Sequence, residues 1–289
     1  MWKLLEEEAE QLHSGKERVR SQKPGSMTMV GGVPAAAAFF ILFLGANGAT
    51  QVKFTFHNNC PETVWPATLS SAGHPPFPTT GFALPPGASL SVAAVTPTWS
   101  GRVWGRYRCA TTSGGASGSR FSCESGDCGT GQVACNGAGG APPATLAEFT
   151  LGGGLRDFYD VSNVDGFNLP VEVRPEDLQD GARCRTTSCP ADINRVCPGE
   201  LAVRAAGGGA AAAAAVACKS ACLAFGTDEY CCRGRFASPA ACGPSRYSKL
   251  FKAQCPQAYS YAFDDGSSTF TCGNATGYRL TFCPAAANN

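Results

Sequence analysis

Histidine is scarce in this sequence, and so are the motifs that mark metal sites. Three histidines, His13, His57 and His74, cannot support several Cys/His zinc sites in a chain of 289 residues. No Cys-x-x-Cys pair occurs, and an all-cysteine zinc site needs such pairs. We therefore expect neither a metal nor a cofactor, and we read His57 as a structural residue.

Charge of either sign is also in short supply. The 23 Lys and Arg against 22 Asp and Glu leave a net charge of +1, which gives no long-range attraction to nucleic acid or anionic membranes. We expect no nucleic-acid partner. Neither a Gly-x-Ser-x-Gly nor a Walker motif is present, so Ser-His-Asp catalysis has little support.

No apolar run reaches the roughly 18 residues that a membrane span needs. The apolar run 35–44 has the length typical of a signal peptide, and small residues follow it, so we predict cleavage between about Gly48 and Thr50. A signal anchor is the alternative. The start codon stays open between Met1, Met27 and Met29. We assign 1–49 to an upstream extension plus signal peptide, 50–284 to one domain, and 285–289 to a short tail.

Cysteine is what the chain has in abundance. Sixteen are present, an even number that favours disulfides and an exported protein. Nine of them lie in the segment from Cys184 to Cys255, which predicts a lobe held together by disulfides at about 184–255. Counting alone allows roughly two million pairings. Adjacent Cys231 and Cys232 are expected to bond to different partners, because a vicinal disulfide strains the backbone.

The remaining sequence predicts a mainly β protein. Apolar and polar residues alternate in 52–57, 169–173 and 278–283, as in half-buried strands. One helix is predicted over Pro244 to Ala253, where Tyr247, Leu250 and Phe251 have helical spacing. The Ala/Gly-rich tract 205–216 is expected to form a surface loop. The fold class is thus a β-sandwich with a cysteine-rich appendage.

Several motifs resemble those of the thaumatin-like proteins, the plant pathogenesis-related proteins of group five. The main one is SRFSCESGDCGTGQVAC at 119–135, although Ser119 stands where that family usually has glycine. The others are TLAEF at 145–149, DFYDVSNVDGFNLP at 157–170, YCC at 230–232 and CPQAYSYAFDD at 255–265. The resemblance spans about 50–284 and includes all sixteen cysteines.

This resemblance implies a flattened β-sandwich, a disulfide-rich helical lobe and a small looped lobe. It also implies eight disulfides that confer resistance to heat, acid and proteases. The implied pairs are Cys60–Cys283, Cys109–Cys123, Cys128–Cys135, Cys184–Cys272, Cys189–Cys255, Cys197–Cys218, Cys222–Cys231 and Cys232–Cys242.

The resemblance further implies an acidic cleft of the antifungal type, formed by Arg102, Glu148, Asp160, Asp165 and Asp265. The alternation in 145–151 agrees in part, because it places Glu148 on the strand face opposite Ala147 and Phe149. A structural network in which Arg102 only neutralises Glu148 and Asp160 is the alternative. Trp104 beside Arg102 suits sugar stacking and packing beneath a cleft equally well. We interpret Asp127 as a turn-forming residue.

Two functions follow as hypotheses. The first is a secreted antifungal defence protein that binds β-1,3-glucan of fungal walls, and also acts on the fungal membrane, without turnover. The second is a weak endo-β-1,3-glucanase with Glu148 as general acid and Asp165 as base or nucleophile. We favour binding, because fold resemblance does not establish catalysis. We expect a monomer in the apoplast rather than the vacuole. Asn274 begins an Asn-x-Thr glycosylation motif.

Overall fold

The computed structural model describes residues 51–113, 118–178, 184–205, 214–273 and 275–285. The predicted signal sequence, its apolar run 35–44 and the glycosylation residue Asn274 lie outside the described residues. Most of the Ala/Gly-rich tract lies outside them too. At the C-terminal end of this tract the loop prediction was wrong, because a β-strand begins at Ala215.

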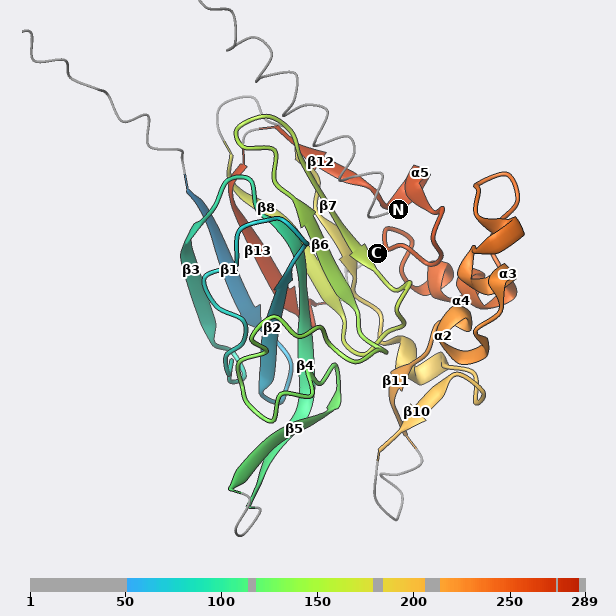
Figure 1. The fold of residues 1–289 in the computed structure, drawn as a ribbon, viewed down its shortest axis with the longest axis horizontal. Helices are drawn as coiled ribbons and strands as arrows, with labels where there is room; N and C mark the ends of the chain where they lie inside the picture. The colour runs from blue at the N-terminus through green and yellow to red at the C-terminus, as the bar shows by residue number, and fades with distance from the viewer. Residues whose placement is uncertain (1–50, 114–117, 179–183, 206–213, 274, 286–289) are drawn as a thin grey trace, which may run out of the picture.

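Two β-sheets packed face to face make up most of the described chain (Figure 1). The five-stranded sheet has the order β3 (Ser89–Val95), β1 (Val52–Asn58), β13 (Ala275–Phe282), β8 (Val171–Leu178) and β9 (Thr187–Cys189). The six-stranded sheet has the order β12 (Phe270–Cys272), β7 (Asp157–Ser162), β6 (Leu146–Thr150), β4 (Ser100–Ser113) and β2 (Val64–Ser70), with β5 (Ser119–Ser125) paired to β4. The mainly β prediction is confirmed, and β1, β8 and β13 fall on the predicted alternating segments.

The two ends of the domain meet inside the five-stranded sheet. Strand β1 runs parallel to β13, with Phe54 opposite Tyr278. The Cys60–Cys283 disulfide closes this pair just beyond the strand ends. A parallel pair between the first and last strands means that the sheet cannot be completed until the whole chain has been made.

Aromatic rings fill the space between the sheets. Phe54 is the centre of this core, with edge-to-face contacts to three rings at centroid distances of 5.3, 5.6 and 5.0 Å: Phe77, Trp99 and Phe149. Such pairs contribute about 0.5–1.5 kcal/mol each beyond their buried area. The sandwich therefore has a conventional, densely packed hydrophobic core.

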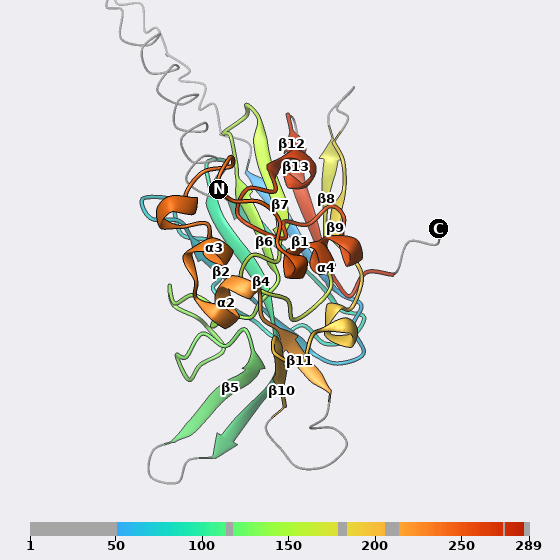
Figure 2. The same ribbon diagram turned by 90° about the vertical axis from the view of Figure 1, so that its right-hand side faces the viewer.

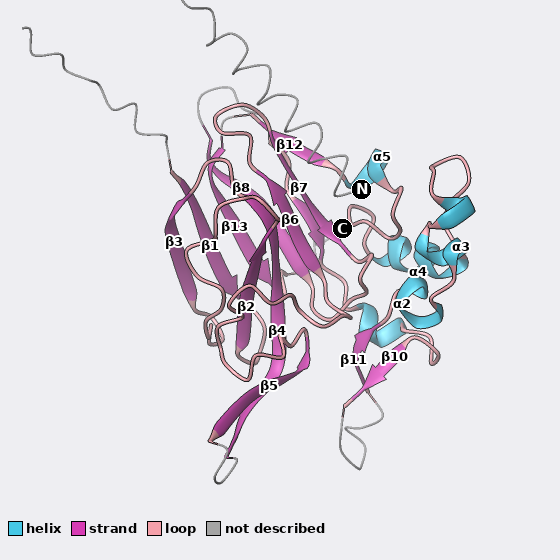
Figure 3. Ribbon diagram, in the orientation of Figure 1, coloured by secondary structure: helices cyan, strands magenta, loops and turns pink. Residues whose placement is uncertain are grey.

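The second body of the protein is a lobe of short helices beside the six-stranded sheet (Figures 1 and 3). Its elements are the 3₁₀ turns η2 (Ile193–Val196) and η4 (Gly234–Phe236), the ribbon of β10 (Ala202–Arg204) and β11 (Ala215–Cys218), and the helices α2 (Ala221–Phe225), α3 (Asp228–Cys231) and α4 (Arg246–Gln254). Helix α5 (Asp265–Ser268) follows the lobe and leads into β12. The predicted helix is confirmed but begins at Arg246, because the Ser245 hydroxyl accepts the Ser248 N–H as the cap.

All sixteen cysteines are bonded, in the eight pairs that the resemblance implies. Three bonds, Cys197–Cys218, Cys222–Cys231 and Cys232–Cys242, lie wholly within the lobe. Cys189–Cys255 ties the end of α4 to β9, and Cys184–Cys272 joins the segment before β9 to β12. Cys231 bonds to Cys222 and Cys232 bonds to Cys242, so the two adjacent cysteines have different partners, as predicted.

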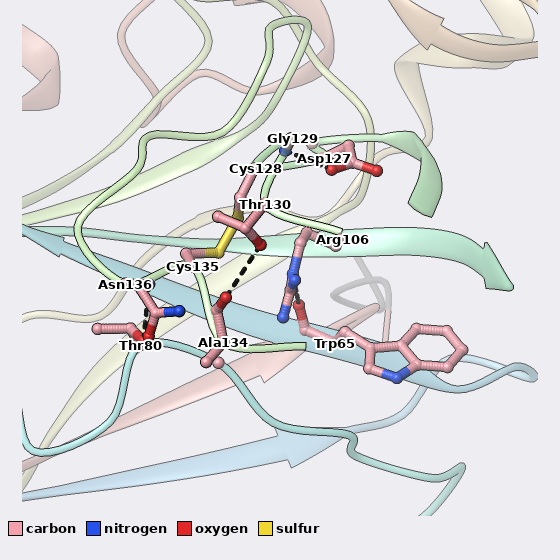
Figure 4. The surroundings of a disulfide bond; sticks show 12 residues. Trp65, Thr80, Arg106, Asp127, Cys128, Gly129, Thr130, Ala134, Cys135 and Asn136 are labelled. Atoms are coloured by element: carbon pink, nitrogen blue, oxygen red, sulfur yellow. Dashed lines mark hydrogen bonds between the residues drawn. A yellow bond between two sulfur atoms is a disulfide. The ribbon is translucent and has the colours of Figure 1, made fainter. Parts of the chain in front are cut away.

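Two β-ribbons, β4–β5 and β10–β11, project from the same end of the molecule (Figure 2). Near the base of the first, a small loop is closed by Cys128–Cys135 (Figure 4). Arg106 donates to the carbonyl of Trp65 at 3.1 Å and to that of Val133 at 2.6 Å. This buried guanidinium thus joins the small loop to the sheet.

Candidate functional site

The site is built on the face of the six-stranded sheet that points away from the aromatic core. Strand register places Arg102 of β4 opposite Glu148 of β6, and Glu148 opposite Asp160 of β7. Neighbouring Ala147 and Phe149 point into the core, so the three polar side chains share the outer face. Directly opposed residues have Cβ atoms about 4.5–5.5 Å apart, which makes this row a continuous polar stripe.

A sharp turn brings Asp165 to the β4 end of the stripe. Gly166 has φ +90°, and its N–H donates to the Asn163 carbonyl at 2.9 Å. A Cβ at position 166 would lie 2.6 Å from the Cys218 oxygen, so glycine is needed here. The turn leaves Asp165 Oδ2 3.9 Å from Arg102 Nη1. The Arg102 side chain is 40% exposed and the Asp165 side chain 50% exposed. Together they form the open edge of the site.

Asp265 lies at the β7 end of the stripe. It is exposed at the start of α5, and its Oδ1 accepts the Tyr259 hydroxyl at 2.9 Å. Tyr259 is held beside β7, because its N–H donates to the Val161 carbonyl. Asp265 also acts electrostatically on Asp160. The five residues predicted for the cleft are therefore brought together along one stripe.

Neighbouring Asp264 has a different role from Asp265. It accepts hydrogen bonds from the Ser260 N–H at 3.0 Å and the Ser260 hydroxyl at 2.8 Å. It also pairs with Lys252 Nζ of α4 at 3.0 Å. Asp264 thus fastens α4 to the loop that carries Asp265, and leaves Asp265 free to face the cleft.

Burial separates the inner carboxyls from the outer ones. Glu148 is only 7% exposed and Asp160 only 1%. Burial raises the pKa of Glu148 to about 7, with Arg102 opposing the rise and Asp165 adding to it. Burial also raises the pKa of Asp160 well above its usual range, reinforced by Glu148 and Asp265. One buried Asp160 oxygen, Oδ1, has no hydrogen-bond partner among the described residues.

These values define what the stripe can do chemically. The raised pKa values mean that Asp160 and Glu148 keep a proton at higher pH than ordinary carboxyl groups do, and the protonated forms can donate hydrogen bonds. Asp165 and Arg102 supply an ion pair at the edge. Arg102 pairs with the half-exposed Asp165 and also lowers the pKa of Glu148, so a structural network around Arg102 stays an alternative to a binding site. A buried carboxyl with a pKa near 7 beside an exposed carboxylate is also the arrangement a general acid needs.

A cavity of about 250 Å³ adjoins the Arg102–Asp165 pair, and no sequence motif predicted it. Trp104, Leu146 and Ala144 are buried residues that line it, and Leu69 and Gly139 form its rim with Arg102 and Asp165. Trp104 packs beneath the surface at 1% exposure, and its Nε1 donates to the Gly126 carbonyl. Trp104 thus packs beneath the surface and also lines the cavity, and its stacking against a sugar stays a hypothesis.

Other residues considered from the sequence have structural surroundings. Asp127 accepts the N–H groups of Cys123 and Gly129, each at 2.6 Å, as a turn-forming residue does. His57 contacts the Ser89 hydroxyl at 2.9 Å on the paired edge of β1 and β3.

Two further observations concern the described part of the chain alone. There, no three His, Cys, Asp or Glu side chains converge in a way that could hold a metal ion. In the same residues, no helix is long and apolar enough to cross a membrane.

A stapled β-sandwich with an acidic stripe beside a helical lobe defines the class of protein, and comparison with known proteins identifies the family. The Thaumatin family model matches residues 58–284. Thaumatin-like protein 1a of Malus domestica is 53% identical over 246 residues, which cover 84% of this chain and 94% of that protein. A Prunus avium protein named glucan endo-1,3-beta-glucosidase is 48% identical and covers 84% of this chain and 95% of its own length. This chain therefore belongs to the thaumatin family.

Proposed function

We propose that this protein is a secreted plant defence protein that binds β-1,3-glucan of fungal walls in the acidic cleft. The observation that carries the proposal is the stripe Arg102–Glu148–Asp160, flanked by Asp165 and Asp265. A defence role fits the family to which the chain belongs.

The chemistry of the stripe favours a neutral, hydroxyl-rich polymer. Four carboxyl groups around one guanidinium leave a negative field that repels anionic polymers. The exposed carboxylates of Asp165 and Asp265 can accept hydrogen bonds from sugar hydroxyls, while the Arg102 guanidinium can donate to sugar oxygens. A stripe with both donors and acceptors in one row can therefore follow a polysaccharide strand.

Hydrolysis is the second candidate, and the pKa of Glu148 near 7 is the observation in its favour. In this scheme Glu148 protonates the leaving oxygen, and Asp165 acts as base or nucleophile. The name of the Prunus avium relative, glucan endo-1,3-beta-glucosidase, also favours hydrolysis. Glu148 is nearly buried in the free protein, however, which is why we place binding first.

The remaining proposals concern the setting of the protein. We place it in the apoplast as a monomer, with fungal wall glucan and the fungal membrane as partners. Asn274 is proposed as the site of glycosylation. Sixteen bonded cysteines support export, since cytosolic thiols are kept reduced.

A binding assay on insoluble β-1,3-glucan tests the first function. The mature chain is expected to sediment with β-1,3-glucan and not with cellulose, and to slow hyphal growth. Asp165→Asn and Arg102→Ala should each weaken binding about ten-fold. Glu124→Gln is the matched control, because Glu124 pairs with Arg108 at 3.6 Å on the β4–β5 ribbon. A wild-type protein that stays in the supernatant would refute the proposal.

Release of reducing sugar from a linear β-1,3-glucan tests the second function. If the chain is an enzyme, Glu148→Gln should abolish release while glucan binding survives. If wild type releases no sugar yet binds, hydrolysis is excluded and the binding function stands.

A further inference from the structure

We propose that the cavity beside the Arg102–Asp165 pair is a separate sugar subsite, which holds one glucosyl residue of a glucan lying in the cleft. The proposal rests on the proposed glucan-binding function and extends it. The cavity shares Arg102 and Asp165 with the cleft and extends beyond them to residues outside the set of five.

The register of the sheet places the cavity at one end of the acidic stripe. Leu69 of β2 lies opposite Arg102, which lies opposite Glu148. In the next row of the same face, Ala67 lies opposite Trp104, which lies opposite Leu146. Leu69, Arg102, Trp104 and Leu146 all line the cavity, so the cavity continues the stripe across β4 toward β2. With strands about 4.8 Å apart, Leu69 and Asp160 are separated by about 14 Å across the sheet.

The lining of the cavity combines an apolar floor with a charged rim. The floor is formed by buried residues, namely Trp104, Leu146 and Ala144. The half-exposed Arg102–Asp165 ion pair forms the side that faces the cleft. A pyranose ring has an apolar C–H face and hydroxyl groups at its edge, which match such a floor and rim. Binding sites for small ligands share this plan of an apolar lining with a few polar groups.

The size of the cavity restricts the ligand. Pockets for drug-sized ligands hold about 300–1,000 Å³, whereas this one holds about 250 Å³. A single sugar ring is a suitable occupant, and two rings are not. One glucosyl residue, at the end of the glucan or at a bend in it, would thus occupy the cavity. The adjoining glucosyl residues would lie over Glu148 and Asp160.

Two glycines line the cavity and differ in the space beside them. A Cβ at Gly140 would lie 2.4 Å from Trp104 Nε1, so this backbone packs directly on the indole. A Cβ at Gly139 would meet only Leu69 Cδ2, at 3.5 Å. Position 139 therefore accepts a side chain without a clash, and a large one there would obstruct the rim.

The experiment measures binding of β-1,3-linked glucose oligomers of two to six units by calorimetry. For wild type, affinity should rise at the length that first reaches the cavity. Gly139→Phe should lose this increment, with at least a ten-fold weaker Kd for the hexamer, equal to about 1.4 kcal/mol. The shortest oligomer that binds should be unaffected. Leu69→Ala, which removes one wall without blocking the rim, should reduce the same increment about three-fold.

Matched variants separate obstruction from misfolding. Gly139→Ala should lose much less of the hexamer affinity than Gly139→Phe, because its Cβ makes only an ordinary contact. Gly199→Phe places the same ring at an exposed lobe glycine that has nothing within 4 Å, and should bind normally. If Gly139→Phe binds the hexamer as wild type does, or weakens all lengths equally, the subsite is refuted while glucan binding stands. If wild type binds no oligomer, the proposed function fails and the subsite fails with it.

Discussion

The sandwich and the helical lobe are held together by different means. In the sandwich, Phe54 alone contacts several aromatic rings, and the disulfides lie at the periphery, beyond the ends of β1 and β13, on the β4–β5 ribbon and in the small loop. In the described part of the much smaller lobe the longest helix, α4, has nine residues, and three internal disulfides connect its segments. Helices this short are marginal in isolation. The lobe therefore relies more on covalent bonds, and the sandwich more on packing.

The acidic stripe lies where these two regions meet. The sandwich supplies Arg102, Glu148 and Asp160 from rigid paired strands. Asp265 comes from the segment that Asp264 fastens to α4 of the lobe. The geometry of the stripe thus depends on both kinds of stabilisation, and each can be disturbed separately.

The largest effect should follow from removing the centre of the aromatic core. Phe54→Ala deletes a fully buried ring with three edge-to-face partners, and should lower the free energy of unfolding by about 3–5 kcal/mol. Urea unfolding with disulfides intact measures this. Leu90→Ala is the control, because Leu90 is exposed on β3 and should cost less than about 0.5 kcal/mol. Equal losses in the two variants would contradict the packing account.

A slightly smaller effect should follow from removing the Cys189–Cys255 disulfide, which ties α4 of the lobe to β9. The double variant Cys189→Ser, Cys255→Ser opens a loop with a sequence separation of 66 and should cost about 3–4 kcal/mol. Hydrogen exchange should show lost protection in α2 and α4 while β1 and β13 stay protected. In the matched variant Cys60→Ser, Cys283→Ser the lobe should keep its protection. Loss of protection in the sandwich alone, after the lobe bond is removed, would overturn the comparison.

Buried carboxyls at the boundary should make stability depend on pH. Burial raises the pKa of Glu148 to about 7 and that of Asp157 to about 6. The folded state then binds more protons than the unfolded one between about pH 4.5 and 7. Stability is therefore fully present in acid and is lost as pH rises through these values. Unfolding free energy should be on the order of 2–3 kcal/mol higher at pH 5 than at pH 8.

Glu148→Gln provides the control for this pH dependence. It removes the titrating group while keeping the shape, so the difference between pH 5 and pH 8 should shrink by about half. An unfolding free energy that rises with pH in wild type would contradict the assignment.

A smaller effect is expected at the small loop. Burial lowers the pKa of Arg106 to about 10, and the charge of Asp127 partly offsets this. Arg106→Met leaves the partly buried carbonyls of Trp65 and Val133 without the Arg106 donor and should cost about 2 kcal/mol. Arg108→Met, which only breaks an exposed pair with Glu124, should cost less than 1 kcal/mol. Similar costs at both positions would show that Arg106 does not anchor the loop.

Much of the fold could be predicted from the sequence, because local alternation determines strand faces. The pattern VKFTFH predicted β1, and the alternation around Glu148 correctly placed it opposite Phe149. The cleft residues and the cysteine pairs came from motif resemblance, since their separation in sequence carries no local signal. Burial of Glu148 and Asp160 could not be predicted, because the segments that cover them are distant in sequence. The cavity was missed because its lining comes from segments that are distant in sequence and that carry no shared chemical motif.

A crystal structure of the mature protein with a β-1,3-linked glucose hexamer tests the central claim most directly. The hexamer should lie along the outer face of the six-stranded sheet, from Asp265 past Glu148 and Arg102, with one ring against Trp104 and Leu69. An oligomer bound on another surface, with this stripe unoccupied, would contradict the account.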